Sequence, residues 1–171
     1  QELSGTPTND EVGDHPVVLT VSDGIETVEQ SFTITVENTN DAPNNFSLIL
    51  PENESMTVLN TFNDSTKFSW YSSFDIDGDS LLYKFVREVI IDSISFGSLI
   101  IDSNTDTSLF VYHQEIYNSF HDTLQALEDS IITFRWHTKA FDITDSTSTD
   151  TFITYFKFSQ NILSINELIG N

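Results

Sequence analysis

The chain has 171 residues, with 27 Asp and Glu against 6 Lys and Arg, which gives a formal net charge of −21. This excess of acid argues against nucleic acids and anionic membranes as partners, because both are bound through basic surfaces. The charge suits a secreted protein whose self-repulsion is relieved by extracellular cations. The lack of cysteine excludes disulfide frameworks, thiolate zinc sites and cysteine nucleophiles.

Two further properties of the sequence bear on its location. No apolar run approaches the roughly 20 residues that a membrane-spanning helix needs, so we expect no membrane span. The acidic start, QELSGTPTNDE, has neither the basic nor the apolar region of a signal peptide. We therefore expect a mature fragment of a longer chain, located outside the cell or at the cell surface.

Polar and apolar residues alternate along most of the chain, which is the pattern of half-buried β-strands. In order, residues 15–22 place Val17, Leu19 and Val21 on one face, and residues 28–36 do the same with Phe32, Ile34 and Val36. Later strand patterns follow at Phe68 and Trp70 and at Leu81, Tyr83 and Phe85. Two more lie at 131–140, with Ile132, Phe134, Trp136 and Ala140 on one side, and at 151–158. Turn residues separate these runs.

Many short alternating segments predict an all-β fold of immunoglobulin-like antiparallel β-sandwiches in tandem. The polar stretch 41–45 marks a boundary. Residues 1–43 supply about three strands, which is half of a β-sandwich, and residues 44–158 supply about seven, enough for a complete one. A single helical turn is expected within 121–129, and residues 159–171 are expected to be a tail or linker.

A family resemblance becomes visible in the first unit. The segment from Leu3 to Pro43 resembles the C-terminal half of a bacterial cadherin-like repeat of the dystroglycan type. Repeats of this kind occur as tandem non-catalytic modules of large secreted or surface proteins. The residues that carry the resemblance are the Gly5-Thr6-Pro7 opening, Asn9-Asp10, Val12-Gly13, Val21-Ser22-Asp23-Gly24 and the closing Asn40-Asp41-Ala42-Pro43.

The second unit is similar to fibronectin-III or cadherin-like sandwiches of bacterial proteins. The similarity rests on KFSWYSSFDIDGDSLLYKF and on FRWHTKAFDITDS. This unit departs from a cadherin repeat in two ways. The Asp-Arg-Glu motif in the middle of the repeat is missing, and Thr144 stands where glycine is usual. The resemblance therefore implies the fold more directly than it implies metal binding.

The DIDGD segment is the main candidate for cation binding. Asp75, Asp77 and Asp79 alternate around Gly78, and Ca²⁺ takes six to eight oxygen ligands of the kind that such carboxylates supply. The alternative is a plain acidic turn, because Asp and Gly form turns by themselves. The cadherin resemblance extends the implied calcium ligand set to Asn40, Asp41, Asp75, Asp77 and Asp142, with Asp79 completing the acidic trio. It also implies a contribution from Asn38 through the linker backbone, makes Glu52 a further but poorer candidate, and would place Asp23 toward an opposite junction.

The sequence gives less support to zinc binding, catalysis or sugar binding. The four histidines lack the spacing of zinc sites, and no serine-nucleophile motif or phosphate-binding glycine loop occurs, so we expect no enzymatic activity. Four aromatic residues could form a sugar-stacking surface, but Trp70 and Trp136 alternate with apolar neighbours, which favours core packing. The aromatic residues in question are Trp70, Tyr71, Tyr83 and Trp136.

Three functions stay open at this stage. The first is a non-enzymatic structural or adhesion module of a large bacterial surface or secreted protein, stiffened by calcium between its domains. The second is a filament or assembly subunit whose half-sandwich is completed by strand exchange with a neighbouring chain. The third is a carbohydrate-binding accessory module. The expected partners are neighbouring repeats, other copies of the chain or a polysaccharide.

Overall fold

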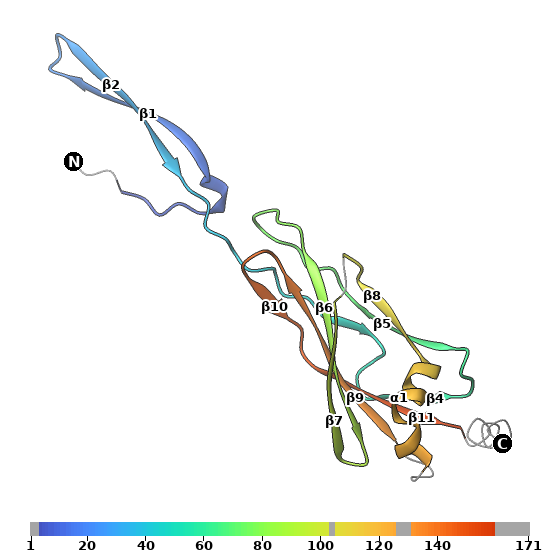
Figure 1. Cartoon of the computed structure of the whole chain (residues 1–171). Helices are drawn as coiled ribbons and strands as arrows, with labels where there is room; N and C mark the ends of the chain where they lie inside the picture. Colours follow the sequence, from blue (N-terminus) through green and yellow to red (C-terminus); the bar gives the residue numbers. More distant parts are fainter. Residues whose placement is uncertain (1–3, 103–104, 126–130, 160–171) are drawn as a thin grey trace.

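The computed structural model describes residues 4–102, 105–125 and 131–159 and divides them into a small N-terminal unit and a larger C-terminal one (Figure 1). The first unit starts with a 3-10 turn, η1 (Asn9–Glu11), followed by strands β1 (Gly13–Ser22) and β2 (Thr27–Val36). These two strands pair antiparallel over their whole length, from Gly13 opposite Val36 to Ser22 opposite Thr27. The roughly three strands expected in 1–43 are thus two in the described part of that segment.

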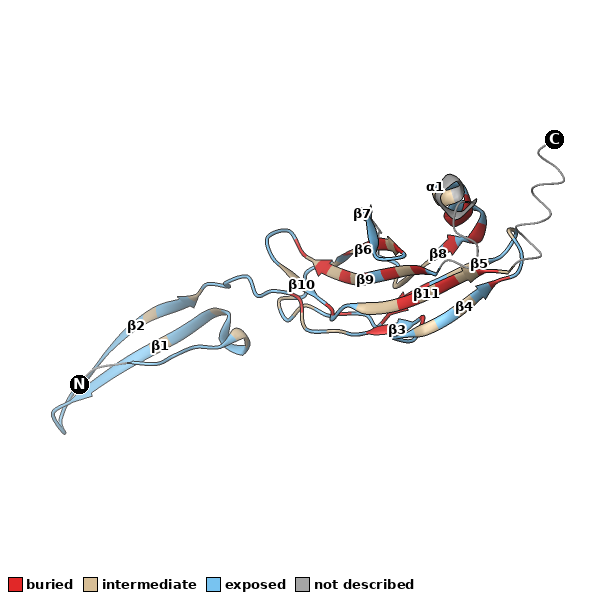
Figure 2. Cartoon of the chain, turned by 90° about the horizontal axis from the view of Figure 1, so that it is seen from below, coloured by how far each residue is buried: buried red, intermediate tan, exposed pale blue. Residues whose placement is uncertain are grey.

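One face of the β1–β2 hairpin is apolar. The register places Val17 opposite Phe32 and Val21 opposite Val28, all on the same side. Val21 is 72% exposed and Val28 is 70% exposed, and no residue between 4 and 36 is buried. The hairpin extends away from the second unit, whose sheets do not cover it (Figures 1 and 2).

The second unit is a two-layer sandwich. One sheet has the strand order β4-β11-β9-β6-β7, with β10 beside β9, and the other has the order β3-β5-β8. All pairings are antiparallel except that of β11 with β4. The strands are β3 (Leu48–Leu50), β4 (Ser55–Leu59), β5 (Ser65–Trp70), β6 (Leu82–Ile91), β7 (Ile94–Asp102), β8 (Ser108–Tyr112), β9 (Ile132–Phe141), β10 (Ser146–Ser148) and β11 (Phe152–Phe158). The predicted all-β sandwich class is confirmed.

Aromatic rings fill the space between the two sheets. Phe68 of β5 meets Trp136 of β9 edge to face, with ring centroids 4.9 Å apart, a geometry that aromatic quadrupoles favour. The Trp136 indole N–H donates to the Thr154 hydroxyl at 3.1 Å, which satisfies the one polar atom of that side chain. Trp70 and Trp136 are 1% and 0% exposed, so their predicted place in the core is confirmed.

The helix α1 (His113–Gln125) differs from the single turn expected at 121–129. It begins eight residues earlier, directly after β8, because Ile116 and Tyr117 turn into the core, where they are 0% and 4% exposed. The Tyr117 ring packs edge to face on Phe158 at 5.6 Å. The expectation was wrong about where the helix starts, and residues 126–129 of the expected turn lie outside the described residues. The same holds for the predicted tail beyond Ser159.

Candidate cation-binding junction

The segment between β2 and β3 joins the two units and is anchored to the second one. The Asn44 backbone N–H donates to the Phe74 carbonyl at 2.9 Å, and the Thr147 hydroxyl donates to the Pro43 carbonyl at 2.5 Å. Pro43 is buried, whereas residues 37–42 are exposed. The linker therefore leaves the sandwich at a fixed point, beside the loop after β5 and the turn after β9.

Asn40 connects the linker to the turn between β9 and β10. Its side-chain amide donates to Asp142 Oδ2 at 3.3 Å and to Asp145 Oδ2 at 3.0 Å. The other Asp142 oxygen, Oδ1, accepts the backbone N–H groups of Thr144 and Asp145, each at 2.6 Å. These hydrogen bonds, led by that from Asp145, hold the pKa of the Asp142 carboxyl below its ordinary value.

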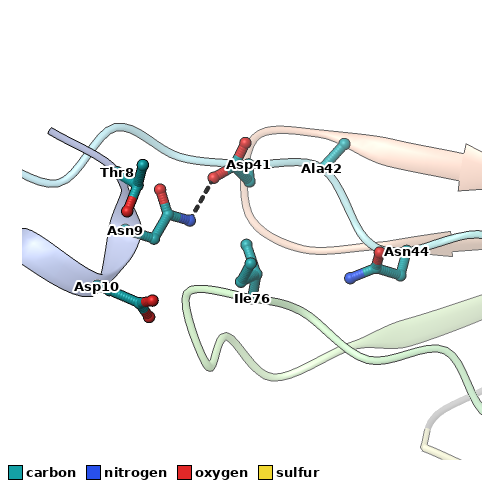
Figure 3. Close-up of a pocket in the computed structure, with 7 residues that line it drawn as sticks. All are labelled: Thr8, Asn9, Asp10, Asp41, Ala42, Asn44 and Ile76. Atoms are coloured by element: carbon teal, nitrogen blue, oxygen red, sulfur yellow. Dashed lines mark hydrogen bonds between the residues drawn. The ribbon is translucent and has the colours of Figure 1, made fainter. Parts of the chain in front are cut away.

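Asp41 connects the same linker to two other segments. Its carboxylate Oδ2 accepts the Asn9 side-chain amide at 2.6 Å, which ties η1 to the linker (Figure 3). Its backbone N–H donates to Asp77 Oδ2 at 2.6 Å, which ties the linker to the loop after β5. Between these segments opens a cleft of about 510 Å³, lined by Thr8, Asn9, Asp10, Asp41, Ala42, Asn44 and Ile76.

Asp75 shapes the DIDGD loop from within. Its Oδ1 accepts the Asp77 backbone N–H at 2.9 Å, and the Gly78 N–H closes the turn on the Asp75 carbonyl at 3.2 Å. Gly78 has φ +81°, a left-handed conformation that suits glycine. The second Asp75 oxygen, Oδ2, is buried and has no hydrogen-bond partner, which is costly for a carboxylate.

The structure thus gathers five of the six predicted ligands at the junction, namely Asn40, Asp41, Asp75, Asp77 and Asp142. The sixth, Asp79, is exposed and makes no hydrogen bond within the described part of the chain. Asp23 lies in the turn between β1 and β2, at the end of the hairpin away from the linker (Figure 1). Its placement toward a junction with a preceding repeat stays a prediction. Within the described residues no group of three or more Asp, Glu, His or Cys is spaced to hold a metal ion.

Sequence reasoning missed two members of this network, Asn9 and Asp145. Asn9 was an anchor of the family resemblance, yet nothing in its position indicated that η1 would lie beside the linker. Asp145 stands three residues after Asp142. At this spacing an aspartate such as Asp142 can accept the backbone N–H of the later residue and so form a turn. That spacing predicts the turn but not the contact of the Asp145 side chain with Asn40.

No protein-family model matches this chain, and no curated protein matches it at a significant level. No helix in the described part of the chain is long and apolar enough to cross a membrane.

Proposed function

We propose that the chain is a non-enzymatic extracellular structural or adhesion module of a large bacterial surface or secreted protein, stiffened by Ca²⁺ at the junction of its two units. The observation that carries this proposal is the convergence of side chains from four segments, namely η1, the linker, the DIDGD loop and the 142–145 turn. Asp41 contacts η1 and the DIDGD loop, and Asn40 contacts the 142–145 turn through both Asp142 and Asp145.

The donor chemistry at this junction fits a hard cation. The ligands available are carboxylate and amide oxygens, which Ca²⁺ prefers. The Asn9 and Asn40 amide groups point their NH₂ donors at carboxylates, so that each partial positive charge lies where a cation would lie. Turning either amide by half a turn exchanges NH₂ for oxygen and adds a ligand in place of a donor. The buried, unpartnered Oδ2 of Asp75 is a further oxygen that a cation would satisfy.

A cation held in this way would restrict the hinge between the units. Without it, the linker joins the hairpin to the sandwich mainly through hydrogen bonds between exposed groups, which are worth little in water. With it, carboxylates that otherwise repel one another share one positive centre. Successive modules joined in this manner would form a rod suited to spacing or adhesion, with neighbouring repeats as partners.

Thermal unfolding in the presence of calcium tests this proposal. Adding Ca²⁺ to chelator-treated protein is expected to raise Tm, since a ligand that binds only the folded state adds about 2.7 kcal/mol at 100 times its Kd. The double variant Asp41→Asn, Asp77→Asn is expected to lose the rise. Glu29→Gln, a carboxylate on the exposed polar face of β2, is the matched control and should keep it. An unchanged Tm in the wild type would overturn the proposal.

A second candidate function rests on the uncovered hairpin. An isolated two-stranded sheet is marginally stable in water, and this one has an exposed apolar face. Among the described residues, no further strand pairs with either of its edges. Strands from another copy of the chain could complete it, which would make the chain a filament or assembly subunit. Light scattering after size exclusion tests this. Oligomers that dissociate in Val21→Thr, Val28→Thr would support assembly, whereas a monomer at high concentration would argue against it.

A further inference from the structure

The few positive charges of this acidic chain gather on one face of the sandwich. In β6, β9 and β11, alternate residues are buried in the core, among them Phe85, Trp136 and Phe156. The residues between them face outward and include four of the six Lys and Arg residues of the chain. We call the outward side chains of these three strands the cationic face. Its positive members are Lys84, Arg135, Lys139 and Lys157, and its one acidic member is Glu88.

Sequence and register show how one-sided this distribution is. Of the 27 Asp and Glu residues of the chain, one lies in strands β6, β9 and β11, and that residue is Glu88. Glu88 pairs with Arg135 at 3.4 Å. The remaining two cations lie elsewhere, with Arg87 buried in the core and Lys67 exposed on β5 of the other sheet. Neutralising the acidic junction does not explain the whole of this clustering. Arg135 and Lys157 lie farther along β9 and β11, away from the junction.

Three of the four positive side chains of this face, Lys84, Arg135 and Lys139, lie close together on β6 and β9. Lys84 lies directly opposite Lys139 in the β6–β9 register, and like charges in that position destabilise a sheet. Arg135, His137 and Lys139 follow one another at every second residue of β9, a step of about 7 Å. The fold therefore bears an electrostatic cost at the Lys84–Lys139 pair. His137 adds an imidazole but no positive charge at neutral pH, because burial and the neighbouring Lys139 lower its pKa.

A small cavity opens at one end of this face. It measures about 250 Å³ and is lined by Lys84, Lys139, Phe141, Asp142, Ile143, Thr144, Asp145 and Ser146. The Lys84 ammonium stands over the Phe141 ring, 5.1 Å from its centroid. The two carboxylates are already engaged by the 142–145 turn and by Asn40. Two ammonium groups, an aromatic ring and hydroxyls are the groups that bind a sugar acid.

We propose that the cationic face binds an anionic polysaccharide, a linear polymer of sugars that bear carboxylate or sulfate groups, with one sugar seated in the cavity beside Lys84 and Lys139. The attraction is local, since charges more than about 8 Å apart are screened at physiological salt and the net charge of −21 acts weakly at contact. A nucleic-acid duplex carries one charge per about 1.7 Å, far denser than the row along β9.

Binding to defined polymers tests this proposal, which does not depend on the junction cation. Biolayer interferometry would be run at about 0.15 M NaCl, where the net charge of −21 is screened beyond about 8 Å. EDTA would be present so that calcium cannot bridge a polymer to the acidic linker. The probes are polygalacturonate for carboxylates, dextran sulfate for sulfates, neutral dextran as the uncharged control and single-stranded oligo-dT for nucleic acid. We expect binding to at least one of the first two, weakened by added NaCl, and none to neutral dextran.

Matched variants locate the site. Lys84→Gln, Lys139→Gln should weaken binding at least tenfold, whereas Lys67→Gln on the other sheet should leave it unchanged. Lys139→Arg, which keeps the charge, should bind as the wild type does. Thermal melts of each variant control for folding. The proposal is overturned if the wild type binds neither anionic polysaccharide, if Lys67→Gln weakens binding as much as the double variant, or if oligo-dT binds more tightly than both.

Discussion

The hairpin and the sandwich show the same alternation of apolar and polar residues, but only the sandwich buries its apolar face. Val21 in the hairpin is 72% exposed, and Trp136 in the sandwich is 0% exposed. The difference is the second layer, since the β3-β5-β8 sheet and α1 cover the larger sheet and nothing between residues 4 and 36 plays that part for the hairpin. Burial at about 25 cal/mol per Å² of apolar surface makes the sandwich the stable unit.

The largest expected effect comes from the core of the sandwich. Phe68→Ala should lower the free energy of unfolding by about 3–5 kcal/mol, because Phe68 is fully buried against Phe85 and Trp136. Leu19→Ala, on the exposed hairpin face, should change it by less than about 0.5 kcal/mol. Urea unfolding followed by tryptophan fluorescence measures the sandwich alone, since both tryptophans lie in it. Equal losses in the two variants would mean that the units unfold as one.

Replacing Arg87 is expected to have a smaller effect on the free energy of unfolding, and one of opposite sign. This side chain is 7% exposed, its Nε and Nη1 are buried without hydrogen-bond partners, and its guanidinium stands 4.6 Å from the Phe134 ring centroid. Burial lowers the pKa of Arg87, against the opposing charge of Glu115. Arg87→Met keeps the packing and removes the unpaired donors, so it should raise the free energy of unfolding by about 1–3 kcal/mol.

The control for Arg87 is Arg135→Met on the same sheet. The Arg135 side chain is 53% exposed and pairs with Glu88 at the surface, so this change should alter stability by less than about 0.5 kcal/mol. Urea unfolding of both variants makes the comparison. A loss of stability in Arg87→Met would mean that the buried guanidinium holds the sheet to α1.

The smallest expected effect is a change in the pH dependence of stability, and it concerns Asp142 at the junction. The Asp142 pKa is lowered by hydrogen bonds from the Asp145 and Thr144 backbone and from Asn40, so the folded state takes up the proton at lower pH than the unfolded state. The resulting stability is present at neutral pH and is lost as pH falls below about 4 toward the folded pKa. Asp142→Asn should therefore be less stable than the wild type at pH 7, with the difference shrinking toward pH 2.

Unfolding in urea and EDTA across this pH range measures the Asp142 effect. Asp150→Asn is the control, because Asp150 is an exposed aspartate in the loop between β10 and β11. It should follow the wild type at every pH. A constant difference between Asp142→Asn and the wild type from pH 7 to pH 2 would contradict the assignment of the stability to the carboxylate.

Part of the candidate site was predictable and part was not. Asp75 and Asp77 follow from a local spacing around Gly78, and the turn they form depends only on neighbouring residues. Asn9 and Asp145 reach the junction through contacts across 32 and 105 positions of sequence, with Asp41 and Asn40 respectively. Local spacing carries no information about pairs so far apart, so these two residues escaped sequence reasoning.

The sequence by itself determined the strands and the sides they would turn inward, because a period of two leaves one face apolar whatever the rest of the chain does. Only the tertiary structure decided which of those faces is covered, where α1 begins and how four cations come to lie together on one sheet. Helix and strand patterns are both possible for the apolar residues between 109 and 117, and the contact of Ile116 and Tyr117 with the core selects the helix. Which apolar face is covered and which cations lie together both depend on how distant strands pair. A local pattern of alternating residues is compatible with many such pairings.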